Sequence, residues 1–186
     1  LGMTLPITPL QILWINMITA VTLGIALAFE PAEGNTMRFP PRPRNEPLLS
    51  PELIWHIVLV ATVFMTGVFG VYLWALDQEY SLELARTMAM STLVMMEIFH
   101  LFSIRSLHGR TLWEALRGIK MLWIAVIMVI GGQFSVTNLT PLQALFDTQA
   151  LSMSDAGLIV SIGVASFTII GLEQQIRLRL SHRRKG

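Results

Sequence analysis

A single carboxylate lies near the middle of an apolar stretch of the sequence, at Glu97 in the run from Ser91 to His100. An ionised side chain at the centre of a bilayer costs about 3 kcal/mol on insertion scales, so it should face a partner, water or an ion. One interpretation is structural: Glu97 makes a hydrogen bond or, when protonated, pairs with His100 one helical turn away. The other is that Glu97 binds a cation, and the residues alone do not decide between the two.

Oxygen-bearing side chains recur every three residues near the start of the sequence, at Asn16, Thr19 and Thr22. On a helix, this spacing can offer a hard cation a ladder of neutral ligands. The same residue types also form hydrogen bonds between membrane helices, with small residues such as Gly24 allowing close approach. Spacing alone favours this second, structural interpretation.

The common motifs of hydrolytic, metal or phosphate chemistry are absent from the sequence. His56, His108 and His182 are scattered without the spacing of a metal site, and there is no cysteine. There is no GxxxxGK[ST] loop to bind phosphate. The basic tail, 177–185, suits a topology-fixing end near anionic lipid, and we expect no nucleic-acid partner. Two glycine pairs suit helix packing: Gly67 with Gly70, and Gly131 with Gly132.

The elements that carry these residues are expected to sit in lipid. Of the 186 residues, 53% are hydrophobic and 13% are charged, and the mean hydropathy is +0.61. A soluble domain normally carries about a quarter charged residues, so this chain has too few to cover a globule with polar surface. The lipid bilayer is therefore the expected surrounding of its apolar side chains.

Charged residues divide the sequence into five apolar segments, and a span needs roughly 20 mostly apolar residues. Such long runs, without alternation of polar and apolar residues, favour helices over strands. We therefore predict an all-α fold, a polytopic membrane bundle of five transmembrane helices. The predicted spans are 9–29, 53–76, 87–104, 121–136 and 157–172.

The connectors show where helices begin and which side they face. A proline-rich loop at 30–51 ends in Ser50 and Pro51, typical of a helix cap and first helical residue, and the run 152–155 offers similar capping. Lysine and arginine concentrate in alternate connectors, which places the proline-rich loop, the 105–120 connector and the C-terminus in the cytoplasm. The basic residues of these segments are Arg38, Arg42, Arg44, Arg105, Arg110, Arg117, Lys120, Arg177, Arg179, Arg183, Arg184 and Lys185.

Several motifs, in order along the chain, resemble the sixth to tenth membrane helices of P-type cation-transporting ATPases, in their calcium-pump-like branch. The likeness covers essentially the whole chain, and the Trp-x-Asn run with the Pro-Pro-Arg loop is specific. The matching segments are Leu5-Pro6, Pro9 to Thr19, Ala28 to Pro31, Met37 to Arg42, Glu46 to Ser50, Met88 to Glu97 and Ile170 to Glu173.

The resemblance implies that Asn16, Thr19 and Glu97 are ligands of the transported cation. The family pattern places an aspartate directly after the threonine, whereas this chain has Ala20 there. Losing that carboxylate removes a charge and an oxygen ligand, so a two-calcium site is not expected. The remaining set, with Thr22, suits one divalent ion, a monovalent ion or a proton.

The resemblance further implies an integral protein of the bacterial plasma membrane that forms part of a pump. This chain holds no phosphorylation or nucleotide domain and no catalytic ATPase residue, so ATP and Mg²⁺ are expected only for the full-length pump. Its expected partners are the missing N-terminal membrane helices and cytoplasmic domains, and we expect a fragment because the first residue is Leu1. Two alternatives stay open: a stand-alone five-span channel-like or scaffolding protein, and a pump whose ion site is no longer used.

Overall fold

The computed structural model describes residues 5–28, 51–106 and 120–184, and the regular structure within these ranges is entirely helical. The predicted all-α class is confirmed. Each predicted apolar segment overlaps one of the long helices, whereas the short α6 was not predicted. Most of the proline-rich loop at 30–51, including Ser50, and most of the 105–120 connector, including His108, lie outside the described residues. The helices are α1 (Pro9–Ala28), α2 (Pro51–Asp77), α3 (Leu82–Ser106), α5 (Lys120–Asn138), α6 (Thr140–Phe146) and α7 (Met153–Arg184).

Local chemistry explains where α2 and α7 begin. Pro51 is the first residue of α2, as predicted, since proline lacks an amide donor that this position would leave unused. At the start of α7, the Asp155 amide donates to Ser152 Oγ at 3.2 Å, and the Ser152 amide donates to Asp155 Oδ2 at 3.1 Å. This reciprocal pair satisfies two amides that a helix start would otherwise leave free, so the predicted cap is confirmed.

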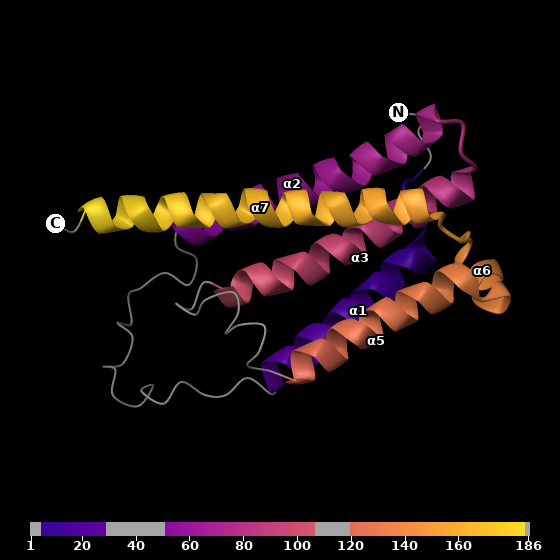
Figure 1. Ribbon diagram of the computed structural model, residues 1–186, viewed down its shortest axis with the longest axis horizontal. Coiled ribbons are helices and arrows are strands. Elements are labelled where there is room, and N and C mark those ends of the chain that lie inside the picture. Colours follow the sequence, from indigo (N-terminus) through magenta and orange to yellow (C-terminus); the bar gives the residue numbers. More distant parts are fainter. Residues whose placement is uncertain (1–4, 29–50, 107–119, 185–186) are drawn as a thin grey trace.

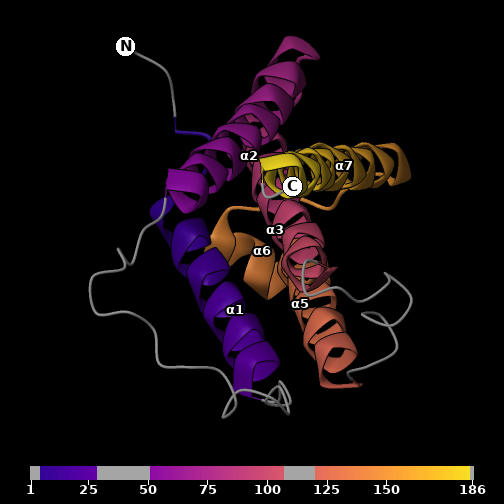
Figure 2. The same ribbon diagram turned by 90° about the vertical axis from the view of Figure 1, so that its left-hand side faces the viewer.

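The helix α3 lies at the centre of the bundle (Figures 1 and 2). It packs along α2 and α7 on one side and makes smaller contacts with α1 and α5 on the other, while α1 packs mainly against α5. The side chains of Met88, Met90 and Met96 on α3 are almost completely buried. Methionine is unbranched and flexible, which suits a helix that must fill gaps between several neighbours.

Glycine allows α3 to approach α2 and α7 closely. A Cβ atom added to Gly163 of α7 would lie 2.6 Å from Cδ2 of Phe99, and one on Gly67 of α2 would lie 2.9 Å from Sδ of Met96. Both distances are shorter than real Cβ contacts, so a larger residue at either position would force the facing side chain of α3 to shift.

The predicted packing role of the paired glycines holds for one member of each pair. Gly132 lies against Trp14, where a Cβ would be 3.3 Å from the indole ring. Gly70 and Gly131 have no atom within 4 Å of such a Cβ. Among the described residues, Gly163 contributes a closer contact than either pair, although spacing did not single it out.

A sharp bend separates α5 from α6, whose axes differ by 86° (Figure 1). Thr148, just after α6, donates its hydroxyl to the carbonyl of Val136 in α5 at 2.6 Å. The next residue, Gln149, donates its amide to Thr87 Oγ1 and its side chain to Glu83 Oε2, at 3.0 and 2.6 Å. These bonds fasten the α6 end of the bundle to the start of α3.

Two described helices are long and apolar enough to cross a membrane, over Leu53–Asp77 and Met153–Arg177. The bent pair, Trp123–Asn138 with Thr140–Phe146, counts as a third if it forms one span, and Pro9–Val21 is a shorter apolar helix. Many large apolar side chains of α2 face outward, which is expected of a surface covered by lipid. These exposed residues include Leu53, Ile54, Trp55, Ile57, Val58, Met65, Phe69 and Leu73.

Candidate cation-binding site

The structure brings Thr19 of α1 and Glu97 of α3 together. The hydroxyl Oγ1 of Thr19 donates a hydrogen bond to Glu97 Oε2 at 2.6 Å, so the carboxylate has the partner that its apolar position requires. The same hydroxyl lies 2.9 Å from the carbonyl oxygen of Ile15. A hydroxyl has one proton, so it serves one acceptor at a time, and a protonated Glu97 would allow both contacts by donating to Thr19.

Apolar neighbours on each helix hold this polar pair in place. Ile15 and Ile18 on α1 are buried beside Thr19, and Met96 and Ile98 on α3 are buried beside Glu97. Thr19 and Glu97 themselves remain partly exposed. The contact is therefore a polar point between two apolar helix faces, open on one side to a further ligand.

Asn16 does not join this contact. Its side chain is exposed, and no hydrogen bond to it occurs within the part of the chain that the structure describes. Ala20, one turn further along, is exposed on the same face of α1. The placement of the Thr22 side chain lies outside the description. The predicted ladder along one face is thus divided, with Thr19 facing α3 and Asn16 facing away.

His100 is not the partner of Glu97 in this structure. The imidazole packs instead against His56 and Phe64 of α2, with ring centroids 6.1 and 5.8 Å away. The structural alternative for Glu97, a hydrogen bond within the bundle, is met by Thr19. Such a bond does not exclude a cation, because a ligating carboxylate is commonly held by a neighbouring donor.

The described residues offer an incomplete set of ligands. Within residues 5–28, 51–106 and 120–184, no three His, Asp or Glu side chains converge as a metal site would require. A calcium ion takes six to eight oxygen ligands, and a magnesium ion takes six. Thr19 and Glu97 can supply a minority of them, so a cation here would need oxygen atoms from another part of a larger protein.

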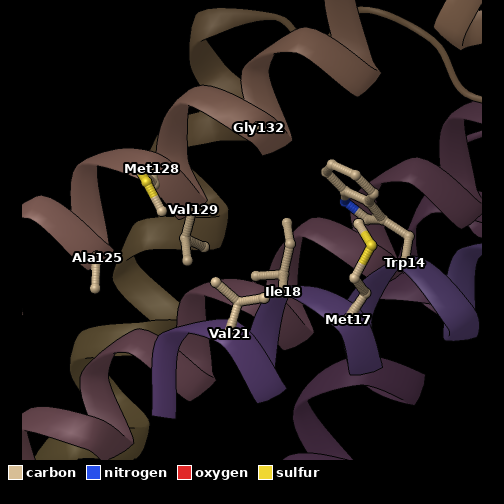
Figure 3. Close-up of a pocket in the computed structure, with 8 residues that line it drawn as sticks. All are labelled: Trp14, Met17, Ile18, Val21, Ala125, Met128, Val129 and Gly132. Carbon is tan, nitrogen blue, oxygen red and sulfur yellow. The ribbon is translucent and has the colours of Figure 1, made fainter. Parts of the chain in front are cut away.

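A pocket of about 160 Å³ lies between α1 and α5 (Figure 3). Its walls are apolar, and Trp14, Ile18 and Val129 project into it from the two helices. A hard cation requires oxygen ligands, so this pocket is not an ion site. Its remaining lining residues are Met17, Val21, Ala125, Met128 and Gly132.

The sequence matches a known protein family over nearly its full length. The family model described as "Cation transporting ATPase, C-terminus" matches residues 4–176. The "Probable cation-transporting ATPase F" of Mycobacterium tuberculosis is 39% identical over 153 residues, covering 82% of this chain and 17% of that protein. The "Cation-transporting ATPase pma1" of Synechocystis is 34% identical over 155 residues, covering 80% and 17%.

A more distant relative covers still more of the chain. The "Calcium-transporting ATPase" of Bacillus subtilis is 28% identical over 178 residues, or 92% of this chain and 19% of that protein. The chain therefore spans less than a fifth of the length of these curated relatives. With a family model that matches nearly its full length, the chain belongs to the cation-transporting ATPases of the P-type class and corresponds to their C-terminal region.

Proposed function

We propose that this chain is the C-terminal part of the membrane transport domain of an ATP-driven P-type cation pump. The observation that carries the proposal is the contact between Thr19 and Glu97, which joins two helices at a polar point in apolar surroundings. The family match over residues 4–176 supports it and does not favour a stand-alone channel-like or scaffolding protein. In the bilayer, α1, α2, α3, α5 and α7 would be the five spans, covering the segments expected from the sequence.

In this proposal, Glu97 is a charged ligand of the transported cation, and Thr19 is a neutral ligand that also positions the carboxylate. Asn16 would contribute from the exposed face of α1, toward helices that this chain does not contain. Those helices would supply the missing oxygen ligands. Ala20 limits the charge of the site, which favours one divalent ion, a monovalent ion or a proton over two calcium ions.

The chemistry of ATP would take place outside this chain. ATP with Mg²⁺ would phosphorylate an aspartate in another domain, and the resulting motion would open the ion site to each side of the membrane in turn. The basic connectors favour a cytoplasmic C-terminus, and the bacterial relatives favour the plasma membrane of a bacterium as its location. The lipid bilayer, the remaining domains of the same pump and the transported cation are the partners that this role requires.

Replacement of Glu97 by Gln in the full-length pump tests the proposal, because it keeps the size of the side chain and removes its charge. We expect the cation concentration for half-maximal ATPase activity to rise at least about tenfold, since affinity depends on the number of charged ligands. Glu83→Gln is the matched control on the same helix, at the α6 end of the bundle. Unchanged ion dependence in Glu97→Gln would contradict the assignment of Glu97 as a ligand.

Substitution of Ala20 by Asp tests whether the site is a reduced calcium site. Ala20 lies on the exposed face of α1 with Asn16, so an added carboxylate would point toward the proposed site and not into the packing of this chain. We expect the variant pump to gain stimulation by calcium. If no cation stimulates the ATPase activity of either the wild type or the variant, the result would instead favour a pump whose ion site is no longer used.

A further inference from the structure

A second group of ionisable side chains lies on the opposite face of α3 from Thr19, between α2, α3 and α7. His56 Nδ1 of α2 is 3.5 Å from Glu173 Oε2 of α7, and each side chain is 14% exposed. The other carboxylate oxygen, Glu173 Oε1, is 3.7 Å from Arg177 Nε one turn along α7. α2 and α7 thus bring one imidazole, one acid and one guanidinium together, and the imidazole and the acid are largely buried.

The two facing atoms of His56 and Glu173 are near each other without being joined. Both His56 Nδ1 and Glu173 Oε2 are buried and have no hydrogen-bond partner among the described residues. Their separation of 3.5 Å is a few tenths of an ångström longer than an N–H···O bond, which is about 2.7–3.2 Å. A proton on His56 Nδ1 and a small approach of the two helices would complete the bond.

The surrounding charges limit this site to one proton. His100 of α3 stacks on His56, with the ring centroids 6.1 Å apart and the planes inclined by 28°. Two charged imidazoles at this distance would repel each other. Of these two rings, His56 is the one described within ion-pair distance of Glu173. Arg177 already balances the charge of Glu173, so the pair does not need a charged His56 at all times. Gln174, the residue after Glu173, is neutral, and so is Ser103 of α3, whose Oγ lies 3.4 Å from Gln174 Oε1.

We propose that His56 and Glu173 form a proton-binding site between α2 and α7, distinct from the Thr19–Glu97 contact. The ligand is a proton taken from water, and its uptake makes His56 Nδ1–H the donor and Glu173 Oε2 the acceptor of an interhelical hydrogen bond. The described charged or titratable groups facing the pair are His100 from α3 and Arg177 from α7. The site rests on the geometry of this chain and holds whichever cation the pump transports.

Solid-state NMR of ¹⁵N-histidine-labelled full-length protein in lipid vesicles tests the proposal. The difference between the spectra of the wild type and His56→Gln identifies the His56 signals. We expect the signals of charged imidazole to grow as the pH of the vesicles is lowered. In Glu173→Gln, the midpoint of this change should move to lower pH, because a favourable negative charge beside the imidazole is lost. In the control Glu83→Gln, the midpoint should not move.

Two results would overturn the proposal: His56 signals that stay in one form from pH 5 to 8, or a midpoint that Glu173→Gln leaves in place. If Glu173→Gln does not fold, Arg177→Gln provides the second variant. Removing the cation that competes for Glu173 should raise the His56 midpoint, and an unchanged midpoint would again contradict the site. None of these measurements uses ATPase activity, so the outcome is independent of the proposed role of Glu97.

Discussion

Two helices pack against α3 in very different ways. α7 lies along α3 with close contacts, where a Cβ atom added to Gly163 would force Phe99 and Met95 to shift. α1 meets α3 over a much smaller area, and its described side-chain hydrogen bond to that helix is the one from Thr19 to Glu97. α1 is held instead by α5 along its length and by the α6 region at its start.

The difference separates a close-packed frame, formed by α2, α3 and α7, from the more loosely held helix α1. Close packing without voids leaves little room for motion, so α2, α3 and α7 should move as one body. α1 carries the candidate ligands Thr19 and Asn16 and has the exposed polar face. An ion pathway needs a boundary where packing can change, and in this bundle the boundary between α1 and α3 is the better candidate.

The largest effect is expected where the frame is tightest. Gly163→Ala adds a Cβ atom 2.6 Å from the Phe99 ring and 2.9 Å from Cγ of Met95, so both side chains must shift. We expect the free energy of unfolding to fall by about 1–3 kcal/mol, as for other overpacked cores. Thermal unfolding in detergent, followed by circular dichroism, measures the change.

Gly171→Ala is the matched control for that substitution, on the same helix. A Cβ atom there has no neighbour within 4 Å, so the change should be neutral or stabilise α7 by up to about 1 kcal/mol. Equal effects of the two substitutions would mean that the contact between α3 and α7 is looser than described.

The next largest effect concerns the anchor of α1. Gln11 is fully buried, and its side-chain amide donates to the carbonyls of Phe146 and Asp147 at 2.9 and 3.3 Å. Gln11→Leu leaves buried polar groups without partners, and we expect a loss of about 2 kcal/mol in the free energy of unfolding. Gln78→Leu, at an exposed position, should cost little. Equal losses would show that α1 is not held at its start.

A smaller effect is expected at the contact between α1 and α3. Thr19→Val keeps the shape of the side chain and removes the donor to Glu97. Hydrogen bonds between membrane helices are worth about 0.6 kcal/mol on average, and rarely more than about 1.7 kcal/mol. We expect a loss in that range from the unfolding midpoint in detergent. Thr168→Val, which removes a bond to the carbonyl of Val164 within α7 itself, is the control.

The smallest effect is expected at the exposed side of the α6 end. Arg86 Nη1 lies 3.2 Å from Asp147 Oδ2, but the Asp147 side chain is half exposed, so water and salt screen the pair. Arg86→Gln should lower the free energy of unfolding by less than about 1 kcal/mol. The difference from the wild type should shrink further in high salt, and a loss as large as that of Gln11→Leu would contradict this ranking.

The positions of the long helices follow directly from the sequence, because each apolar run is bounded by charges, prolines or caps. The ends were less predictable. The predicted fifth span stops at Leu172, yet α7 runs from Met153 to Arg184. The charged residues Glu173 and Arg177 end the apolar run of the sequence, but charged residues do not end a helix. The α6 helix was missed, although Pro141 close to Asn138 is a signal that the preceding helix ends there.

The candidate site was only partly predictable, for geometric reasons. Glu97 was expected to have a partner, and residue spacing cannot say that Thr19 of another helix provides it. A spacing of three residues drifts by about 60° around a helix at each step, which is why Asn16 and Thr19 face different directions. His56 and Glu173 are far apart in the sequence, and only the packing of α2 against α7 brings them together.

The length of α7 would make movements of the membrane-embedded bundle detectable at its C-terminal end. Thirty-two residues form a rod of about 48 Å, whereas the hydrocarbon layer is about 30 Å thick. In a bilayer, the last turns of this rod would stand clear of the lipid, beyond the apolar stretch that ends at Arg177. A small change in the tilt of α7 inside the membrane would move this end sideways by a larger distance. A fluorescent label near residue 184 could therefore read out rearrangements deep within the bilayer.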